Sequence, residues 1–161
     1  MKHNTANIFL SFILLLCSLP VFAETIASYA FINDDGTLRI NRKTIHLYGI
    51  LIPQTSVNCS KQRPSFCGER AALALEFKIS NFVRCEVMGE KTDGSLIGQC
   101  FANYSHFDEG DDLSAYLLER GWAAALPDAP VEYQVLERIA QSRRMGIWGI
   151  PIDRPYISPF R

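Results

Sequence analysis

Acidic side chains gather at three places in the chain, and grouped carboxylates can bind a hard cation such as calcium. These places are residues 34–35, Asp93, and the polar segment 108–112, which reads DEGDD. The segment 108–112 lacks the spaced ligands of a dedicated calcium loop. Because an apolar helical pattern follows directly, Asp111 or Asp112 is well placed to cap a helix. We therefore predict a helix cap here and keep a calcium site as the alternative.

The N-terminus has the pattern of a secretory signal. Lys2 is followed by the apolar run IFLSFILLL and by the cleavage-type positions Val21 and Ala23. The run is shorter than the roughly 20 residues that a membrane-spanning helix needs. We expect a signal peptide over residues 1–23 and an exported protein, periplasmic or secreted, that has no membrane attachment after cleavage.

Four cysteines follow the predicted signal. They suggest disulfides, because their number is even and the chain is predicted to be exported. Three pairings are possible. The arrangement favours Cys59 with Cys67 across a short loop, and Cys85 with Cys100 across a hairpin around the turn EKTDGS. A zinc site is the alternative, but the spacings are not those of a zinc finger.

Length, composition and charge limit the possible functions. The 161 residues, 48% of them hydrophobic, fit one globular domain, which we place at residues 24–150, with a Pro-rich extension over 151–161. Without residues 1–23 the chain has 15 basic and 17 acidic side chains, a formal charge of −2. Such a protein gains nothing from its overall field when it approaches a polyanion. Arg143 and Arg144 could form a local basic patch, but cations completing the last turn of a helix explain them better.

Apolar periodicity predicts the order of the elements. Three strands over residues 27–33, 36–42 and 43–51 should form a meander, followed by a helix over 69–80 and a hairpin over 82–102. This order suits an α+β fold, namely a five-stranded Greek-key β-barrel of the OB type with three helices.

Two predicted helices complete the domain. The first covers residues 113–126 and is closed near Gly121, and the second covers residues 131–146 and stops at Gly146 as a C-terminal cap. An apolar stripe at helical spacing marks the second helix, formed by Val131, Val135, Leu136 and Ile139.

Several motifs in order over residues 27–149 resemble the staphylococcal nuclease family of secreted, calcium-dependent phosphodiesterases. They are DDGTLRI, IHLYGILIPQ, FCGERAALAL, VRC with DGSLIGQC, DLSAYLLERGWAAA and RRMGIWG. The resemblance implies a five-stranded OB barrel with three helices. It also implies a site with carboxylates on a cation, a glutamate that orients water, and two arginines on the phosphate.

The positions equivalent to these family residues carry other side chains here. Gly36 and Leu51 stand where the family has metal-binding carboxylates, His46 and Ser95 where it has arginines, and Gln54 where it has the glutamate. An apolar side chain cannot donate an oxygen to calcium, and Gln54 is a poor base. His46 is a weaker, pH-dependent substitute for a guanidinium, although it could be cationic in mildly acid conditions. Because losing one such group can lower the rate by about 10²–10³, losing all of them should leave little hydrolysis. We expect no bound metal and no cofactor.

These observations predict a thermonuclease-like pseudoenzyme that works as a binding or structural module, expected to be a monomer. Its partner would be a protein or a neutral ligand rather than nucleic acid. Leu51 and Ile52 could be exposed on the cleft as a protein contact, or simply buried. The candidate cleft residues are His46, Tyr48, Gln54 and Ser95.

Two alternatives stay open. One is an active, calcium-dependent nuclease acting on DNA or RNA, with a relocated site built from residues 34–35, Asp93 or the segment 108–112. The other is a nucleic-acid-binding OB module without cleavage, which needs a basic face with stacked aromatics. Its candidate aromatic residues are Tyr104, His106 and Phe107, which could equally be packing residues.

Overall fold

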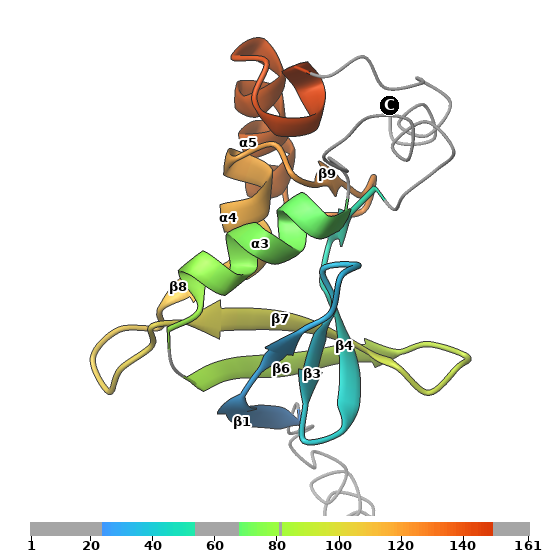
Figure 1. Ribbon diagram of the computed structural model, residues 1–161, viewed down its shortest axis with the longest axis vertical. Helices are drawn as coiled ribbons and strands as arrows, with labels where there is room; N and C mark the ends of the chain where they lie inside the picture. Colours follow the sequence, from blue (N-terminus) through green and yellow to red (C-terminus); the bar gives the residue numbers. More distant parts are fainter. Residues whose placement is uncertain (1–23, 54–67, 81, 150–161) are drawn as a thin grey trace, which may run out of the picture.

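The computed structural model describes residues 24–53, 68–80 and 82–149. Over these ranges the chain is a mixed α+β structure, in which a curled sheet forms a half-barrel and three α-helices lie to one side of it (Figure 1). The predicted α+β class and the three helices are confirmed. Within the described ranges, no helix has the length and apolar character needed to cross a membrane. Four predictions fall outside these ranges: the signal over 1–23, Gln54, the Cys59–Cys67 disulfide and the extension over 151–161.

The described strands form two sheets. The larger has the order β1-β6-β7-β4-β3-β2, with β8 pairing with β7, and the smaller consists of β5 and β9. The strands are β1 (Thr25–Tyr29), β2 (Phe31–Ile32), β3 (Leu38–Ile40), β4 (Lys43–Leu47), β5 (Ile50–Leu51), β6 (Phe82–Glu90), β7 (Leu96–Ala102), β8 (Asp111–Asp112) and β9 (Ala124–Ala125).

The segment predicted as one strand over residues 27–33 consists of two strands separated by Ala30. β1 pairs antiparallel with β6, whereas β2 pairs antiparallel with β3. The predicted meander is therefore right for β2, β3 and β4 and wrong for β1. Because these two halves of one segment occupy opposite ends of the strand order, the sheet has to curl to accommodate both.

β4 and β7 form a parallel pair, in which His46 lies opposite Ile97. Parallel neighbours need a crossover connection, and here the chain between them runs through the helix α3 (Gly68–Lys78) and through β6. The pairing places the β6–β7 turn, residues 91–95, next to β4. Two segments far apart in the sequence thus become neighbours.

The predicted hairpin over 82–102 is confirmed, and so is its disulfide. Cys85 on β6 lies opposite Cys100 on β7, and the two fully buried cysteines are bonded to each other. This pair therefore cannot act as zinc ligands. Around it, the buried core includes Leu38, Ile40, Ile45, Leu75, Val83, Leu113, Leu117 and Leu118.

The helix α4 (Leu113–Glu119) begins at the predicted cap. The Asp112 carboxylate accepts hydrogen bonds from the N–H groups of Ser114 at 2.8 Å and Ala115 at 3.1 Å. The helix is shorter than the predicted 113–126, because Gly121 takes a φ of +70° and residues 124–125 pair as β9 with β5.

Asp112 also joins α4 to two other elements. Its Oδ2 atom accepts hydrogen bonds from the hydroxyl of Tyr133 at 2.5 Å and from Nε2 of Gln99 on β7 at 2.9 Å. Burial, followed by the bond to Asp112, raises the pKa of Tyr133 well above its usual value of 10, so the hydroxyl remains a donor in ordinary solution. One carboxylate thus connects β7, α4 and the helix α5 (Val131–Ser142).

The predicted apolar stripe on the last helix is not its buried face. The side that packs inward carries Tyr133, Glu137 and Ala140. The bond from Tyr133 to Asp112 requires that side to face the N-terminus of α4. The apolar positions lie elsewhere on the helix, with Leu136 half-buried and exposed fractions of 75% for Val131, 44% for Val135 and 38% for Ile139.

The last helix also ends earlier than predicted, at Ser142 rather than at Gly146. Arg143 is its C-terminal cap and Arg144 lies beyond it, so the last turn has no basic side chain and the prediction that these two cations complete that turn is wrong. A 3-10 helix, η1 (Gly146–Gly149), follows. Gly146 instead packs against Gly121, where an added Cβ would lie 2.2 Å from the Gly121 carbonyl oxygen. The N–H of Ile147 donates to that oxygen at 2.8 Å.

Candidate functional site

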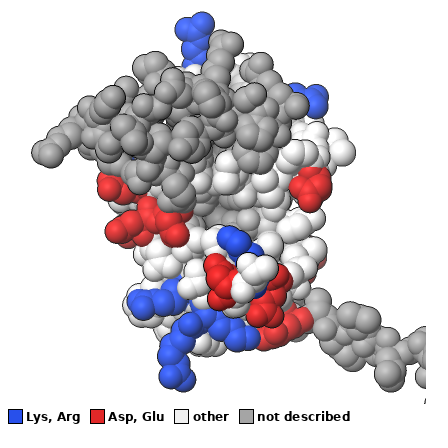
Figure 2. Space-filling model, turned by 90° about the vertical axis from the view of Figure 1, so that its right-hand side faces the viewer, with Lys and Arg blue, Asp and Glu red and all other residues white. Residues whose placement is uncertain are grey.

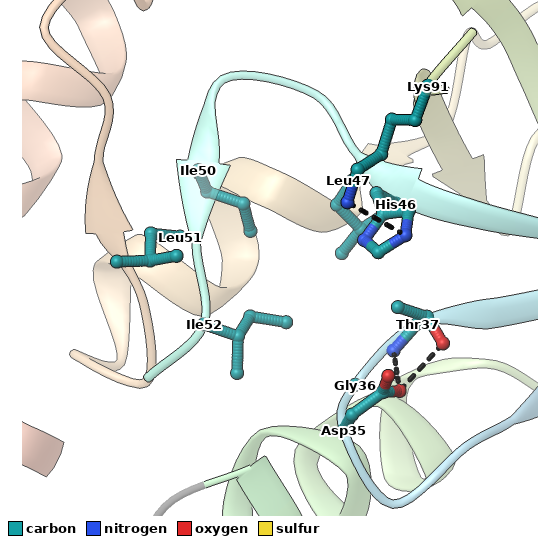
Figure 3. A pocket seen from close by; sticks show the side chains of 9 residues that line it. All are labelled: Asp35, Gly36, Thr37, His46, Leu47, Ile50, Leu51, Ile52 and Lys91. Carbon is teal, nitrogen blue, oxygen red and sulfur yellow. Dashed lines mark hydrogen bonds between the residues drawn. The ribbon is translucent and has the colours of Figure 1, made fainter. Parts of the chain in front are cut away.

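A pocket of about 240 Å³ lies between the β2–β3 turn, the segment from β4 to β5, and the β6–β7 turn (Figure 3). Three of the five family-equivalent positions line it together, namely Gly36, His46 and Leu51. The pocket has one polar and one apolar side. Its polar side chains belong to Asp35, Thr37, His46 and Lys91.

The β2–β3 turn, residues 33–37, supplies the first polar group. Oδ1 of Asp35 accepts two hydrogen bonds from Thr37, one from its N–H at 2.9 Å and one from its hydroxyl at 2.6 Å. The N–H of Gly36 donates to the Asn33 carbonyl at 2.8 Å, and Gly36 has a φ of +78°, which glycine adopts without strain. The turn therefore uses Asp35 as an internal acceptor at the edge of the pocket.

Gly36 stands where the resemblance places a metal-binding aspartate, and the structure leaves little space there for any side chain. An added Cβ would lie 2.6 Å from Cδ1 of Ile52. A carboxylate at this position would therefore require Ile52 to move. An apolar side chain occupies the space next to the position that the family uses for a metal ligand.

His46 on β4 is the central polar side chain of the pocket, and its Nε2 lies 3.4 Å from Nζ of Lys91. An ammonium group has no acceptor, so Nε2 must accept and the neutral ring carries its proton on Nδ1. Burial, and then the charge of Lys91, lower the pKa of His46 below 6.5, while Asp35 and Asp93 act in the opposite direction. The ring is therefore neutral at pH 7, and the cationic form predicted for mildly acid conditions needs a pH below 6.5.

Nothing in the sequence pointed to Lys91, although it is the cation among the described residues that line the pocket. It lies in the β6–β7 turn, 45 residues from His46, and the parallel pairing of β4 with β7 brings the two together. Its ammonium group forms no ion pair with an acidic side chain of the described residues. The turn motif EKTDGS predicts a hairpin but does not indicate which strand lies beside it.

The apolar side of the pocket follows the chain from the end of β4 through β5. Figure 3 shows the side chains of Ile50 and Ile52 on the side that faces His46, whereas Leu51 is directed the opposite way. Ile50 is buried, and Leu51 and Ile52 are half-buried. Neither of the two predicted alternatives, full exposure or full burial, therefore describes Leu51 and Ile52. Leu47 completes this side.

Two of the other predicted cleft residues, Ser95 and Tyr48, do not line the pocket. The Ser95 hydroxyl donates to Asp93 Oδ1 at 2.6 Å within the β6–β7 turn, and Ser95 is buried. Tyr48 follows β4, and its carbonyl accepts a hydrogen bond from the Ser114 hydroxyl at 2.9 Å. Gln54 lies outside the described residues. A role for Tyr48, Gln54 and Ser95 in binding stays a prediction.

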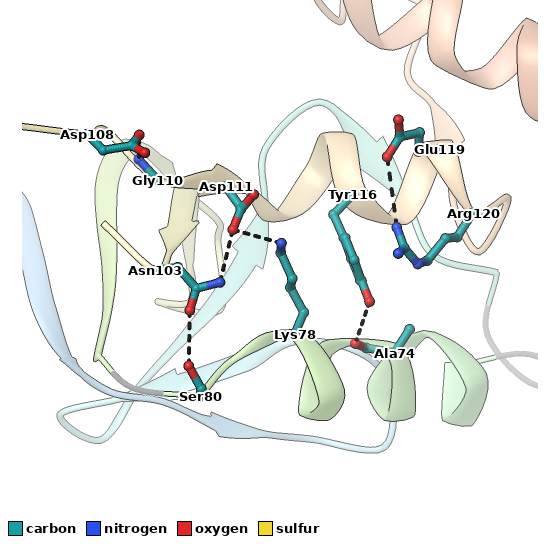
Figure 4. A network of polar contacts seen from close by, with 10 residues as sticks. All are labelled: Ala74, Lys78, Ser80, Asn103, Asp108, Gly110, Asp111, Tyr116, Glu119 and Arg120. Atoms are coloured by element: carbon teal, nitrogen blue, oxygen red, sulfur yellow. Dashed lines mark hydrogen bonds and ion pairs between the residues drawn. The ribbon is translucent and has the colours of Figure 1, made fainter. Parts of the chain in front are cut away.

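The acidic segment 108–112 takes part in the fold (Figure 4). Asp111 pairs with Nζ of Lys78 at 2.7 Å and accepts from Nδ2 of Asn103 at 2.9 Å, and these two bonds lower the pKa of Asp111. Asp112 is the cap of α4. Across the described part of the chain, no three His, Cys, Asp or Glu side chains are grouped so that they could hold a metal ion.

The aromatic residues of the 103–110 loop do not form one stack. Tyr104 lies 5.7 Å from the guanidinium of Arg84, whereas the ring of His106 contacts that of Phe107 edge-on at 5.1 Å. Phe107 is 96% exposed. On the face shown in Figure 2, acidic side chains lie among basic ones over the lower half. This mixture differs from the continuous basic groove of a single-strand-binding protein.

The described residues thus define a small α+β half-barrel with an amphipathic pocket beside β4 and β5. No protein-family model matches the chain, and no curated protein matches it. Any family assignment therefore depends on the sequence motifs, the strand order and the pocket.

Proposed function

We propose that this chain is an exported OB barrel of the staphylococcal nuclease type that no longer hydrolyses phosphodiesters and acts as a binding module. The strand order supports such a barrel. Counting β1 and β2 as one bent strand, the sheet path begins and ends on that strand and passes through four others. A closed five-stranded barrel needs such a path.

The pocket is the observation that carries the loss of hydrolysis. The resemblance equates Gly36 and Leu51 with metal-binding carboxylates and His46 with an arginine, and these three positions line one pocket. Calcium needs six to eight oxygen ligands. Glycine and leucine side chains provide none, and Ile52 fills the space beside Gly36.

The remaining polar groups support binding better than catalysis. His46 is neutral and accepts a hydrogen bond from Lys91, so the described lining of the pocket has one cation where the family uses two arginines. Asp35 is the one carboxylate among the lining residues, and its Oδ1 is bonded twice within its own turn. An apolar wall and a single cation suit a ligand that brings apolar surface of its own.

An active nuclease with a relocated calcium site is the second candidate, and one observation favours it. The charges of Asp35 and Asp93, from two different turns, both act on His46. Within the described residues these three side chains do not form a group that could hold a metal ion, so this candidate requires them to move closer together. This candidate predicts calcium binding that depends on Asp35 and Asp93 together.

Calcium titration separates the two candidates. We would titrate calcium into the purified, oxidised chain, freed of the predicted signal, by calorimetry, and follow digestion of single-stranded DNA with and without chelator. We expect no heat of binding and no cleavage that the chelator abolishes. Chelator-sensitive cleavage that is lost in D35N/D93N, and retained in the control D128N, would instead establish the relocated site.

A further inference from the structure

The pocket beside β4 has hydrogen-bond donors at one end and aliphatic side chains at the other (Figure 3). Nζ of Lys91 and Nδ1–H of His46 are donors, because Nε2 of His46 already accepts from Lys91. Ile50 and Ile52 lie across from them. A ligand that satisfies both ends must accept hydrogen bonds with one group and cover apolar surface with another.

We propose that this pocket binds a carboxylate carried on a short aliphatic chain, with the carboxylate at Lys91 and His46 and the chain against Ile50 and Ile52. The proposal rests on the proposed function, since it names the ligand class of the same binding site. The carboxylate could belong to a small free acid or to the last residue of a peptide. The two share the chemistry that the pocket would recognise.

Lys91 favours an anion at the His46 end of the pocket, and the charges of Asp35 on the pocket wall and Asp93 in the β6–β7 turn oppose it. Within the described residues, the ammonium of Lys91 contacts a neutral imidazole and forms no ion pair with a carboxylate. A carboxylate would accept hydrogen bonds from Lys91 and His46 at once, and hydrogen bonds between charged groups are the stronger ones. An amine would instead meet two donors.

The size of the pocket limits the length of the chain. A volume of 240 Å³ corresponds to about eight water molecules at roughly 30 Å³ each. This fits an acid of the size of hexanoate or a single leucine residue with its terminal carboxylate. It lies below the roughly 300–1,000 Å³ of sites for larger ligands. A strand of nucleic acid fits this pocket poorly, because it would place hydrated phosphates against the apolar side chains of Ile50 and Ile52.

The test is a titration of the isotope-labelled, oxidised chain followed by NMR at pH 7.5. We expect hexanoate to shift the signals of His46, Ile50 and Ile52 with a dissociation constant of about 1 mM, since a fragment of this size has little surface to offset the entropy of association. Each methylene added from butyrate to hexanoate should tighten binding about fourfold. Hexanol and hexylamine should bind at least tenfold more weakly.

Matched variants locate the anion. K91Q should weaken hexanoate binding about tenfold, because it removes the cation and leaves the aliphatic wall intact. K43Q is the control, since Lys43 lies on β4 and pairs with Glu24 outside the pocket, and it should bind as the unaltered chain does. Both lysines are exposed, so both variants should fold, which their NMR spectra will show.

Further ligands distinguish the source of the carboxylate. N-acetyl-leucine that binds more tightly than hexanoate would indicate a peptide end, and the reverse order would indicate a free acid. Three outcomes would overturn the proposal: no shift with hexanoate, equal binding of hexanol, or equal binding by K91Q and the unaltered chain.

Failure of this proposal can be told apart from failure of the proposed function. If the chain neither binds calcium nor cleaves DNA, and also fails to bind hexanoate, only the proposed ligand class is overturned. Chelator-sensitive cleavage would overturn the proposed function whatever hexanoate does.

Discussion

The turn at residues 33–37 and the turn at residues 91–95 have the same local structure in different surroundings. In each, an aspartate accepts bonds from the N–H at 2.9 Å and the hydroxyl at 2.6 Å of the residue two positions later. The glycines between them, Gly36 and Gly94, have φ values of +78° and +80°. The pattern Asp-Gly-Thr or Asp-Gly-Ser therefore accompanies the same turn at both places.

The two turns differ in how closely other residues pack against them. An added Cβ on Gly36 would meet Ile52 at 2.6 Å, whereas around Gly94 the nearest atom is Oε1 of Glu90, at 3.9 Å. The first turn forms part of the pocket wall, and the second contributes Lys91 from its first position. Tertiary packing rather than turn sequence thus decides what each turn can contribute to a site.

The largest predicted effect concerns the disulfide, which cross-links the hairpin of the second turn. C85A/C100A should lower the free energy of unfolding by about 3 kcal/mol, because the bond closes a loop with a sequence separation of 15. Urea denaturation measures this change. Unlike a reductant, the variant leaves Cys59 and Cys67 untouched. In C85A/C100A, amide hydrogen exchange should accelerate more at Ser95, in the cross-linked hairpin, than at Thr37. Equal acceleration at both residues would show that the disulfide does not stabilise its own hairpin in particular.

Glycine substitutions compare the two turns directly. G94A should lower the free energy of unfolding by about 1–2 kcal/mol, because alanine is strained at positive φ. G36A should cost about 1 kcal/mol more, because Ile52 must leave its preferred rotamer. Urea denaturation of both variants tests the difference.

Ile52 provides the control for that difference. In an I52V background, which lacks Cδ1, the cost of G36A should fall to that of G94A. An unchanged excess would mean that something other than Ile52 resists a side chain at position 36.

His46 lies between the two turns and should report on both. NMR titration should give a pKa below 6.5, and K91Q should raise it only in part, because burial is the larger cause. Since the unfolded chain then binds more protons between the folded pKa and 6.5, the free energy of unfolding should fall as the pH drops through that window. Below the folded pKa the decrease should stop. H46N should lack this pH dependence.

The smallest predicted effect is the titration of Asp93. Its hydrogen bonds from Ser95 lower its pKa below 3.8, so this contribution to stability is present above pH 3.8 and is lost as the pH falls through the folded pKa. NMR of the side-chain carboxyl group should show the pKa of Asp93 rising in S95A. T37A, the matched change in the other turn, should leave the pKa of Asp93 unchanged.

Elements specified by nearby residues were predictable from the sequence. The hairpin, the Cys85–Cys100 bond and the Asp112 cap each depend on residues fewer than 20 positions apart, the widest hairpin pair being Val83 with Ala102. The start of α3 near Gly68 was predictable for the same reason, because the apolar spacing within one segment defines this helix.

Features that depend on distant partners were not predictable in this way. The partner of β1 is β6, more than 50 residues away, so no local pattern reveals that residues 25–29 leave the meander. The inward side of α5 depends on the bond from Tyr133 to Asp112 and not on the spacing of its valines. The position of Lys91 beside His46 likewise required the strand order.

The shared acceptor Asp112 has a consequence for how the molecule unfolds. Its carboxylate accepts two backbone N–H groups of α4, the Gln99 amide of β7 and the Tyr133 hydroxyl of α5. Separating either helix from the sheet would leave part of this partly buried cluster unpaired, which costs free energy. We therefore expect α4, α5 and β7 to open as one cooperative unit, so that the helical layer and the curled sheet share a single folding transition.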